Sequence, residues 1–119
     1  MNGMNEGILI KFYNEPLNGH TKSELITMLI SALKERVSEA YIFGSVATNT
    51  FTSDSDVDIM LVVETKLGFI DRPKEFLDIM DIVPNMDILV YTPLEFNKLT
   101  TNPTIGFWES VTKTMEKII

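Results

Sequence analysis

The sequence contains no cysteine, which excludes a disulfide framework and thiolate chemistry. No apolar run approaches the length of a membrane span, and residues 1–19 hold no signal-peptide core, so a cytoplasmic protein is expected. Basic residues are also few: 10 Lys and Arg stand against 17 Asp and Glu, which gives a formal net charge of −7. This acidity argues against broad, sequence-independent binding to nucleic acid, which depends on basic side chains that neutralise phosphates.

The length and composition indicate one globular domain. The chain has 119 residues, of which 45% are hydrophobic and 23% charged, and a single hydrophobic core is typical of such a chain. Residues 20–119 are expected to form this domain. Residues 1–19 are an N-terminal extension, in which the stretch 7–13 forms either a short edge strand or part of a mobile tail. Its apolar and aromatic content favours the strand.

A capping box predicts the start of the first helix. Thr21 and Glu24 have the spacing at which each side chain can accept a hydrogen bond from the backbone N–H of the other. The helix is expected to run to about residue 35, with Lys34 and Arg36 in its last turn, where the helix dipole favours positive charge. The residues of its core-facing stripe, at helical spacing, are Leu25, Leu29, Leu33 and Val37.

The rest of the chain has the pattern of strands that alternate with helices. Strands are predicted at 40–43, 57–63 and 85–91. The first two are apolar on both faces, so they are expected in the interior of a sheet. Asp71 is a candidate N-cap for a helix that Pro84 ends. A second capping box, Thr92 with Glu95, begins a short helix, and a last helix is expected to reach Ile118. This order predicts an α/β fold in which helices pack on a small mixed sheet.

The most informative stretch lies between the first two predicted strands. Gly44 has no side chain, so backbone and ligand can approach closely there, and residues after Ser45 can begin a helical turn that favours a phosphate. Further along, Asp56 and Asp58 project from one side of a strand, about 6 to 7 Å apart at their Cα atoms. Such a pair is unfavourable without a cation, and Mg²⁺ binds carboxylate oxygens while keeping positions for water and phosphate. The stretch therefore predicts a site for a metal and a nucleoside triphosphate.

Two other interpretations apply to Asp56 and Asp58: a solvated strand entry and a calcium loop. The stretch from Asp54 begins like an EF-hand, but Ile59 and Thr65 occupy the sixth and twelfth positions, where that motif needs Gly and Glu. The calcium loop is therefore excluded, and the spacing from the Gly-Ser pair favours the metal site over a solvated pair. Asp54 is expected to shape the turn before the strand.

The sequence resembles the polymerase-β-like nucleotidyltransferase superfamily. The resemblance is carried by the Gly44–Ser45 pair, by Asp56 and Asp58 separated by one residue, and by the apolar strand that follows them. It covers about residues 20–118, and the short length resembles the minimal nucleotidyltransferase branch. It implies the palm-like fold of that superfamily.

The resemblance also implies a third carboxylate. Asp87 lies at the start of the strand at 85–91, where the superfamily places it, and the three carboxylates converge if that strand lies beside 57–63. The chain departs from the family pattern at Val46 and Asn49, where members often carry Arg and Gly.

The activity that the resemblance implies is transfer of AMP from ATP to a hydroxyl acceptor, with release of pyrophosphate. Asp56, Asp58 and Asp87 would hold two Mg²⁺ ions, with Mn²⁺ as an alternative, and Asp87 would help to deprotonate the attacking hydroxyl. Gly44 and Ser45 would position the β- and γ-phosphates.

The minimal branch resembles antitoxins that pair with a helical partner of the HEPN type, so a tyrosine of such a partner is the leading candidate acceptor. The alternatives are a non-enzymatic module that neutralises the partner by contact and a small-molecule (antibiotic) nucleotidyltransferase. The apolar end Ile118–Ile119 also suggests a protein contact, with a partner or as a homodimer. Phe107 and Trp108 lie at helical spacing, which favours a core or interface position over a base-stacking platform.

Overall fold

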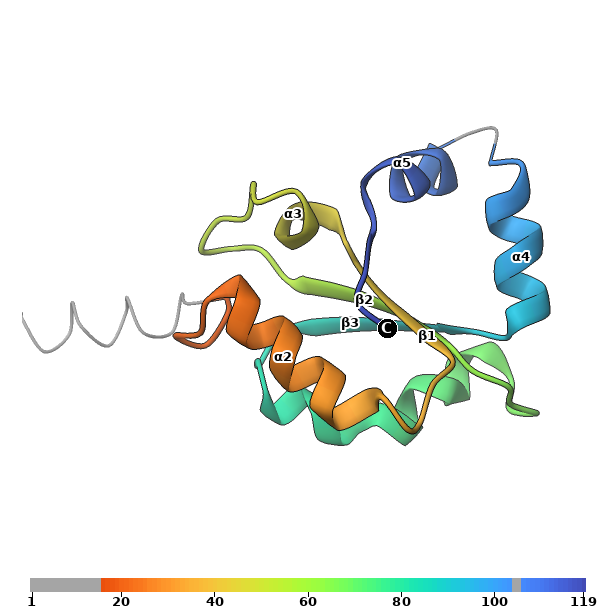
Figure 1. Ribbon diagram of the computed structural model, residues 1–119, viewed down its shortest axis with the longest axis horizontal. Helices are drawn as coiled ribbons and strands as arrows, with labels where there is room; N and C mark the ends of the chain where they lie inside the picture. Colours follow the sequence, from red (N-terminus) through yellow and green to blue (C-terminus); the bar gives the residue numbers. More distant parts are fainter. Residues whose placement is uncertain (1–15, 104–105) are drawn as a thin grey trace, which may run out of the picture.

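A mixed β-sheet forms the centre of the protein (Figure 1). The computed structural model describes residues 16–103 and 106–119, so the strand expected at 7–13 lies outside the described residues. The strands are β1 (Glu39–Phe43), β2 (Val57–Val62), β3 (Met86–Tyr91) and β4 (Glu116–Lys117), in the order β3-β2-β1-β4. β1 pairs antiparallel with β2 and with β4, whereas β2 and β3 are parallel. The predicted small mixed sheet with interior strands β1 and β2 is confirmed.

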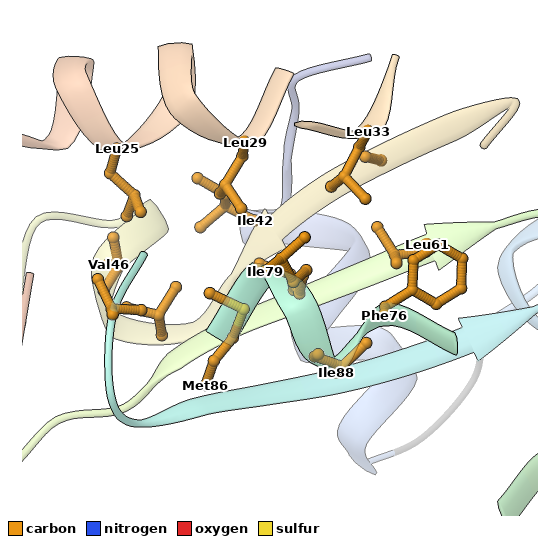
Figure 2. Packing of buried hydrophobic residues seen from close by; sticks show 14 of the residues in the cluster. Leu25, Leu29, Leu33, Ile42, Val46, Leu61, Phe76, Ile79, Met86 and Ile88 are labelled. Atoms are coloured by element: carbon orange, nitrogen blue, oxygen red, sulfur yellow. The ribbon is translucent and has the colours of Figure 1, made fainter. Parts of the chain in front are cut away.

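Helices cover both faces of this sheet. α2 (Lys22–Leu33) and η1 (Phe69–Asp81) lie on one face, and α4 (Pro93–Thr101) and α5 (Gly106–Thr114) lie on the other (Figure 1). Figure 2 shows the larger core, where Leu25, Leu29 and Leu33 of α2 meet side chains of β1, β2, β3 and η1. The smaller core, under α4 and α5, consists of Tyr41, Phe43, Met60, Val62, Phe96 and Val111. No helix in the described ranges has both the length and the apolar character needed to cross a membrane.

Both capping boxes form as the sequence predicts. The Thr21 N–H donates to Glu24 Oε1 at 2.8 Å, and the Glu24 N–H donates to Thr21 Oγ1 at 3.1 Å. Thr92 and Glu95 repeat the arrangement at the start of α4, at 2.9 and 3.2 Å. These contacts span only three residues, so local sequence is sufficient to specify them.

The predicted extent of the last helix is wrong. α5 ends at Thr114, and the chain continues as β4 beside β1. The Ile118 N–H donates to the Ala40 carbonyl at 2.8 Å, and the Ala40 N–H donates to the Ile119 carbonyl at 3.1 Å. The extended form satisfies the backbone groups of β1 that would otherwise form an open edge. It also packs Ile118 and Ile119 against the larger core, where both side chains remain partly exposed.

Two other helix ends differ from the prediction. α2 ends at Leu33, and no basic residue lies in its last turn. Arg36 follows in the next turn and instead contacts Asp78 of η1. Asp71 is not the N-cap of the next helix, because η1 begins earlier, after Gly68, and the Asp71 N–H donates to the Gly68 carbonyl at 3.0 Å. Both differences follow from contacts between elements, which local helix signals do not encode.

A buried arginine joins η1 to the start of α4. Arg72 is 8% exposed, and its guanidinium donates to both carboxylate oxygens of Glu95, at 2.6 and 3.2 Å. It also donates to the carbonyls of Val90 and Leu67. The hydrogen bond from Arg72, followed by the Thr92 N–H, lowers the pKa of Glu95 to about 2. One guanidinium therefore fixes the helix start, the end of β3 and the loop before η1.

The variant Arg72→Ala is expected to lower the free energy of unfolding by about 2 kcal/mol, because the buried Val90 carbonyl loses its donor while Glu95 stays hydrated. Arg36→Ala is the matched control, since Arg36 also makes a two-pronged contact, with Asp78, but its side chain is 35% exposed. Its cost should be about 1 kcal/mol or less. Urea unfolding of both variants measures the difference, and equal losses would contradict the structural role of Arg72.

Candidate active site

The turn at Gly44 connects β1 to the one-turn helix α3 (Gly44–Ala47). Gly44 has a φ of +73°, in the left-handed region that glycine adopts without steric cost. A Cβ atom at this position would lie 2.3 Å from Oδ2 of Asp58, far inside van der Waals contact. Two independent constraints therefore require glycine at this position: the left-handed backbone conformation and the lack of room for a Cβ atom. The second also shows that the turn lies directly against the Asp58 carboxylate.

The residues after Gly44 complete a tight turn despite their departure from the family pattern. The Thr50 N–H donates to the Ser45 carbonyl at 2.9 Å. Asn49 has a φ of +61°, which asparagine tolerates better than most residues, so it serves where relatives often carry Gly. Val46 is fully buried in the larger core (Figure 2). The position after Ser45 therefore contributes to packing.

The register of the sheet brings Asp58 and Asp87 together. Asp58 on β2 is the cross-strand partner of Phe43 on β1 and of Asp87 on β3. Cross-strand partners point to the same face, which here is the face under α4 and α5, because Phe43 belongs to that core. Asp56 lies just before β2 and is exposed, and Asp54 is exposed in the turn before it.

The surroundings of Asp58 disfavour its charge. Burial is the largest cause, followed by the charge and hydrogen bond of Asp87 and the charge of Asp56, and together they raise the pKa of Asp58 to about 6. A carboxylate in such a position gains most from a nearby cation, because the cation removes the repulsion that raises the pKa.

The aspartates fit the chemistry of a Mg²⁺ site, since all of them offer the carboxylate oxygens that this ion prefers. Asp87, the cross-strand partner of Asp58, and the charge of Asp56 both contribute to the raised pKa of Asp58. No group of three or more His, Cys, Asp or Glu side chains in the described part of the chain is gathered closely enough to hold a metal. The structure therefore brings Asp58 and Asp87 together and does not gather Asp56 with them.

The comparison with known families shows to which family the chain belongs. The family described as "Polymerase beta, Nucleotidyltransferase" matches residues 25–119, a range that includes the Gly44 turn and the aspartates. The chain belongs to this family. No curated protein matches it. A crystal structure described as "a putative nucleotidyltransferase from Sulfolobus solfataricus" is 24% identical, with 65% of this chain and 75% of that chain covered and a TM-score of 0.49. The assignment rests on the family match.

A hollow of about 330 Å³ in this nucleotidyltransferase domain lies away from the aspartates. Arg36, Arg72 and Phe76 are part of its lining, and it lies near the last residues of β2 and β3, whereas the aspartates lie near the first. Its two guanidinium groups are already paired with Asp78 and Glu95. Paired cations are poor phosphate ligands, so the aspartates remain the better candidate site for a triphosphate in this domain.

One aromatic residue near the aspartates of the nucleotidyltransferase domain was not predicted to belong to the site. Phe107 on α5 is 51% exposed, so it does not lie in the core. Its ring packs edge-on with Phe43, the cross-strand partner of Asp58, at 5.8 Å between centroids. Helical spacing could not reveal that Phe107 lies near Asp58. That proximity depends on the pairing of β1 with β2, which sets Phe43 beside Asp58.

Proposed function

We propose that this protein is a magnesium-dependent nucleotidyltransferase that moves AMP from ATP to a hydroxyl acceptor. The observation that carries the proposal is the cross-strand pair of Asp58 and Asp87 beside the Gly44 turn. The raised pKa of Asp58 supports it, because a carboxylate kept in an unfavourable setting is typical of a functional site. Membership of the nucleotidyltransferase family supplies the reaction class.

The proposed roles follow from the positions of the residues. Asp56, Asp58 and Asp87 would hold Mg²⁺, with Mn²⁺ as an alternative. When bound, such ions neutralise charge on the triphosphate and make an acceptor hydroxyl easier to deprotonate. Gly44 and Ser45 would position the β- and γ-phosphates, since the turn that begins α3 lies against the Asp58 carboxylate. Asp87, which is exposed, would face the incoming acceptor.

The acceptor that we propose is a tyrosine of a helical partner protein of the HEPN type. The described residues form one sheet with its covering helices and leave no separate unit among them for a small acceptor. An exposed carboxylate at the edge of the sheet is accessible to a side chain of another protein, since β3 is an edge strand among those of the described residues. The chain would then act as an antitoxin that modifies its partner.

Asp87→Asn is expected to keep most of the affinity for Mg-ATP and to lower AMP transfer by on the order of a hundredfold or more. An alcohol or phenol is a poor nucleophile until its proton is removed, and an amide cannot help to remove it. The measurement is incorporation of label from ATP labelled at the α-phosphate into a co-expressed helical partner, with Mg-ATP affinity determined alongside.

Asp54→Asn is the matched control, because Asp54 is also an exposed aspartate on the approach to β2. The Asp54→Asn variant should transfer labelled AMP to the partner at the same rate as the unmodified protein. Parent-level labelling by Asp87→Asn would remove Asp87 from the reacting groups. A parent that binds no Mg-ATP, yet still neutralises the partner, would identify a binding module instead of an enzyme.

A further inference from the structure

Phe107 lies one aromatic ring away from the aspartate pair. Phe43 is the last residue of β1 and stands beside Asp58 on the same face of the sheet. The Phe107 ring meets Phe43 at 5.8 Å and at 85°. α5 also contacts α3, the turn that begins with Gly44 (Figure 1). The ring is therefore close both to the aspartates and to the turn proposed to hold phosphates.

The ring is held in place although about half of it is exposed. Trp108 packs edge-on against Phe107 at 5.5 Å, and Tyr91 packs against Trp108 at 5.3 Å. Edge-to-face contacts of this kind contribute about 0.5 to 1.5 kcal/mol each beyond the apolar area that they bury. An exposed phenylalanine that its neighbours support from two sides is a fixed surface rather than a mobile side chain, and its open part is available to a flat apolar group.

We infer that Phe107 is the stacking platform for the base of the bound nucleotide. This inference rests on the proposed function, in which the triphosphate binds at the Gly44 turn and at the metal held by the aspartates. The ribose separates the base from the α-phosphate, so the base needs a surface about one side chain away from the aspartates, and Phe107 stands at that separation from Asp58, beyond Phe43. The substrate class is then a nucleoside triphosphate rather than an inorganic polyphosphate. Stacking on an aromatic ring tolerates every base, because every base has a π-face.

The test compares Mg-ATP with Mg-tripolyphosphate, which has the phosphates but no base. Phe107→Ala is expected to weaken Mg-ATP binding by about 5- to 150-fold, the loss of one base–aromatic stack. Its affinity for Mg-tripolyphosphate should stay at the parent value. Phe107→Tyr keeps an aromatic face and should bind Mg-ATP within a few-fold of the parent. Ile70→Ala removes another exposed apolar side chain, from η1 on the opposite face of the sheet, and should change neither affinity.

A spectroscopic measurement gives a second result that does not depend on transfer activity. Trp108 is the only tryptophan in the sequence and its ring contacts Phe107. Mg-ATP should change its fluorescence, whereas Mg-tripolyphosphate should not. Parent-level Mg-ATP binding by Phe107→Ala would overturn the stacking role, as would an equal loss for both ligands. A parent that binds neither ligand would overturn the proposed function itself, and this result is distinct from the other two.

Discussion

Asp58→Asn is expected to stabilise the fold at neutral pH while lowering nucleotide transfer by on the order of a thousandfold. Activity is lost because a neutral amide replaces the most buried of the three carboxylates. Stability is gained because burial and the neighbouring aspartates disfavour the charge of Asp58. The gain at pH 8 should be about 1 to 2 kcal/mol, after allowance for the partial hydration of the side chain.

The raised pKa of Asp58 determines the direction in which the stability of the parent changes with pH. The pKa of Asp58 is about 6 in the folded protein against an ordinary value of 3.8, so the folded chain holds this proton more tightly than the unfolded chain does. The resulting stabilisation is fully present below about pH 3.8 and is lost as the pH rises through about 6. Asparagine resembles the protonated form at every pH. The difference between variant and parent should therefore be largest above pH 6 and small at pH 4.

Urea unfolding at pH 4 and pH 8 measures this effect, with Mg²⁺ absent so that no cation compensates the charge. Asp54→Asn again serves as the control, because Asp54 is exposed and its replacement should leave the pH dependence of the parent unchanged. Adding Mg²⁺ at pH 8 should raise the stability of the parent and not that of Asp58→Asn. A parent and variant whose stabilities differ equally at both pH values would show that Asp58 is not repelled by its neighbours.

Gly44→Ala is expected to lower the free energy of unfolding by about 3 kcal/mol or more and to abolish Mg-ATP binding. A left-handed backbone costs a residue with a Cβ about 1 to 2 kcal/mol. The added Cβ would also stand 2.3 Å from the Asp58 carboxylate, so either the turn or Asp58 must shift. Either shift separates the turn from the aspartate pair.

Gly19→Ala separates the two costs. Gly19 has a similar φ of +80°, but a Cβ there would meet no atom of the described residues within 4 Å. Its replacement should cost only the backbone term, about 1 to 2 kcal/mol, and leave Mg-ATP binding intact. A double-mutant cycle with Asp58→Ala is the sharper measurement, because it removes the carboxylate that the new methyl group would strike. In that background Gly44→Ala should cost no more than Gly19→Ala, and an undiminished cost would place the clash elsewhere.

Contacts that span only a few residues were predictable from the sequence. Thr21 with Glu24 and Thr92 with Glu95 form their capping boxes because each contact joins a residue to the third one after it. The failures concern contacts between distant segments. Asp71 is not an N-cap because η1 begins before it. The predicted end of the last helix is instead the strand β4, because it pairs with the edge of β1 that would otherwise be open.

The sequence by itself determined the family, the α/β fold class and the spacing that places Asp56 and Asp58 near one another. Only the tertiary structure decided that Asp58 lies opposite Asp87 and beside Phe43, that Gly44 touches its carboxylate, and that Phe107 remains exposed next to them. The reason is the register of the sheet. A shift of one residue between strands would turn every side chain to the other face. Because β1 and β2 are buried on both faces, alternation along them does not reveal which register is adopted.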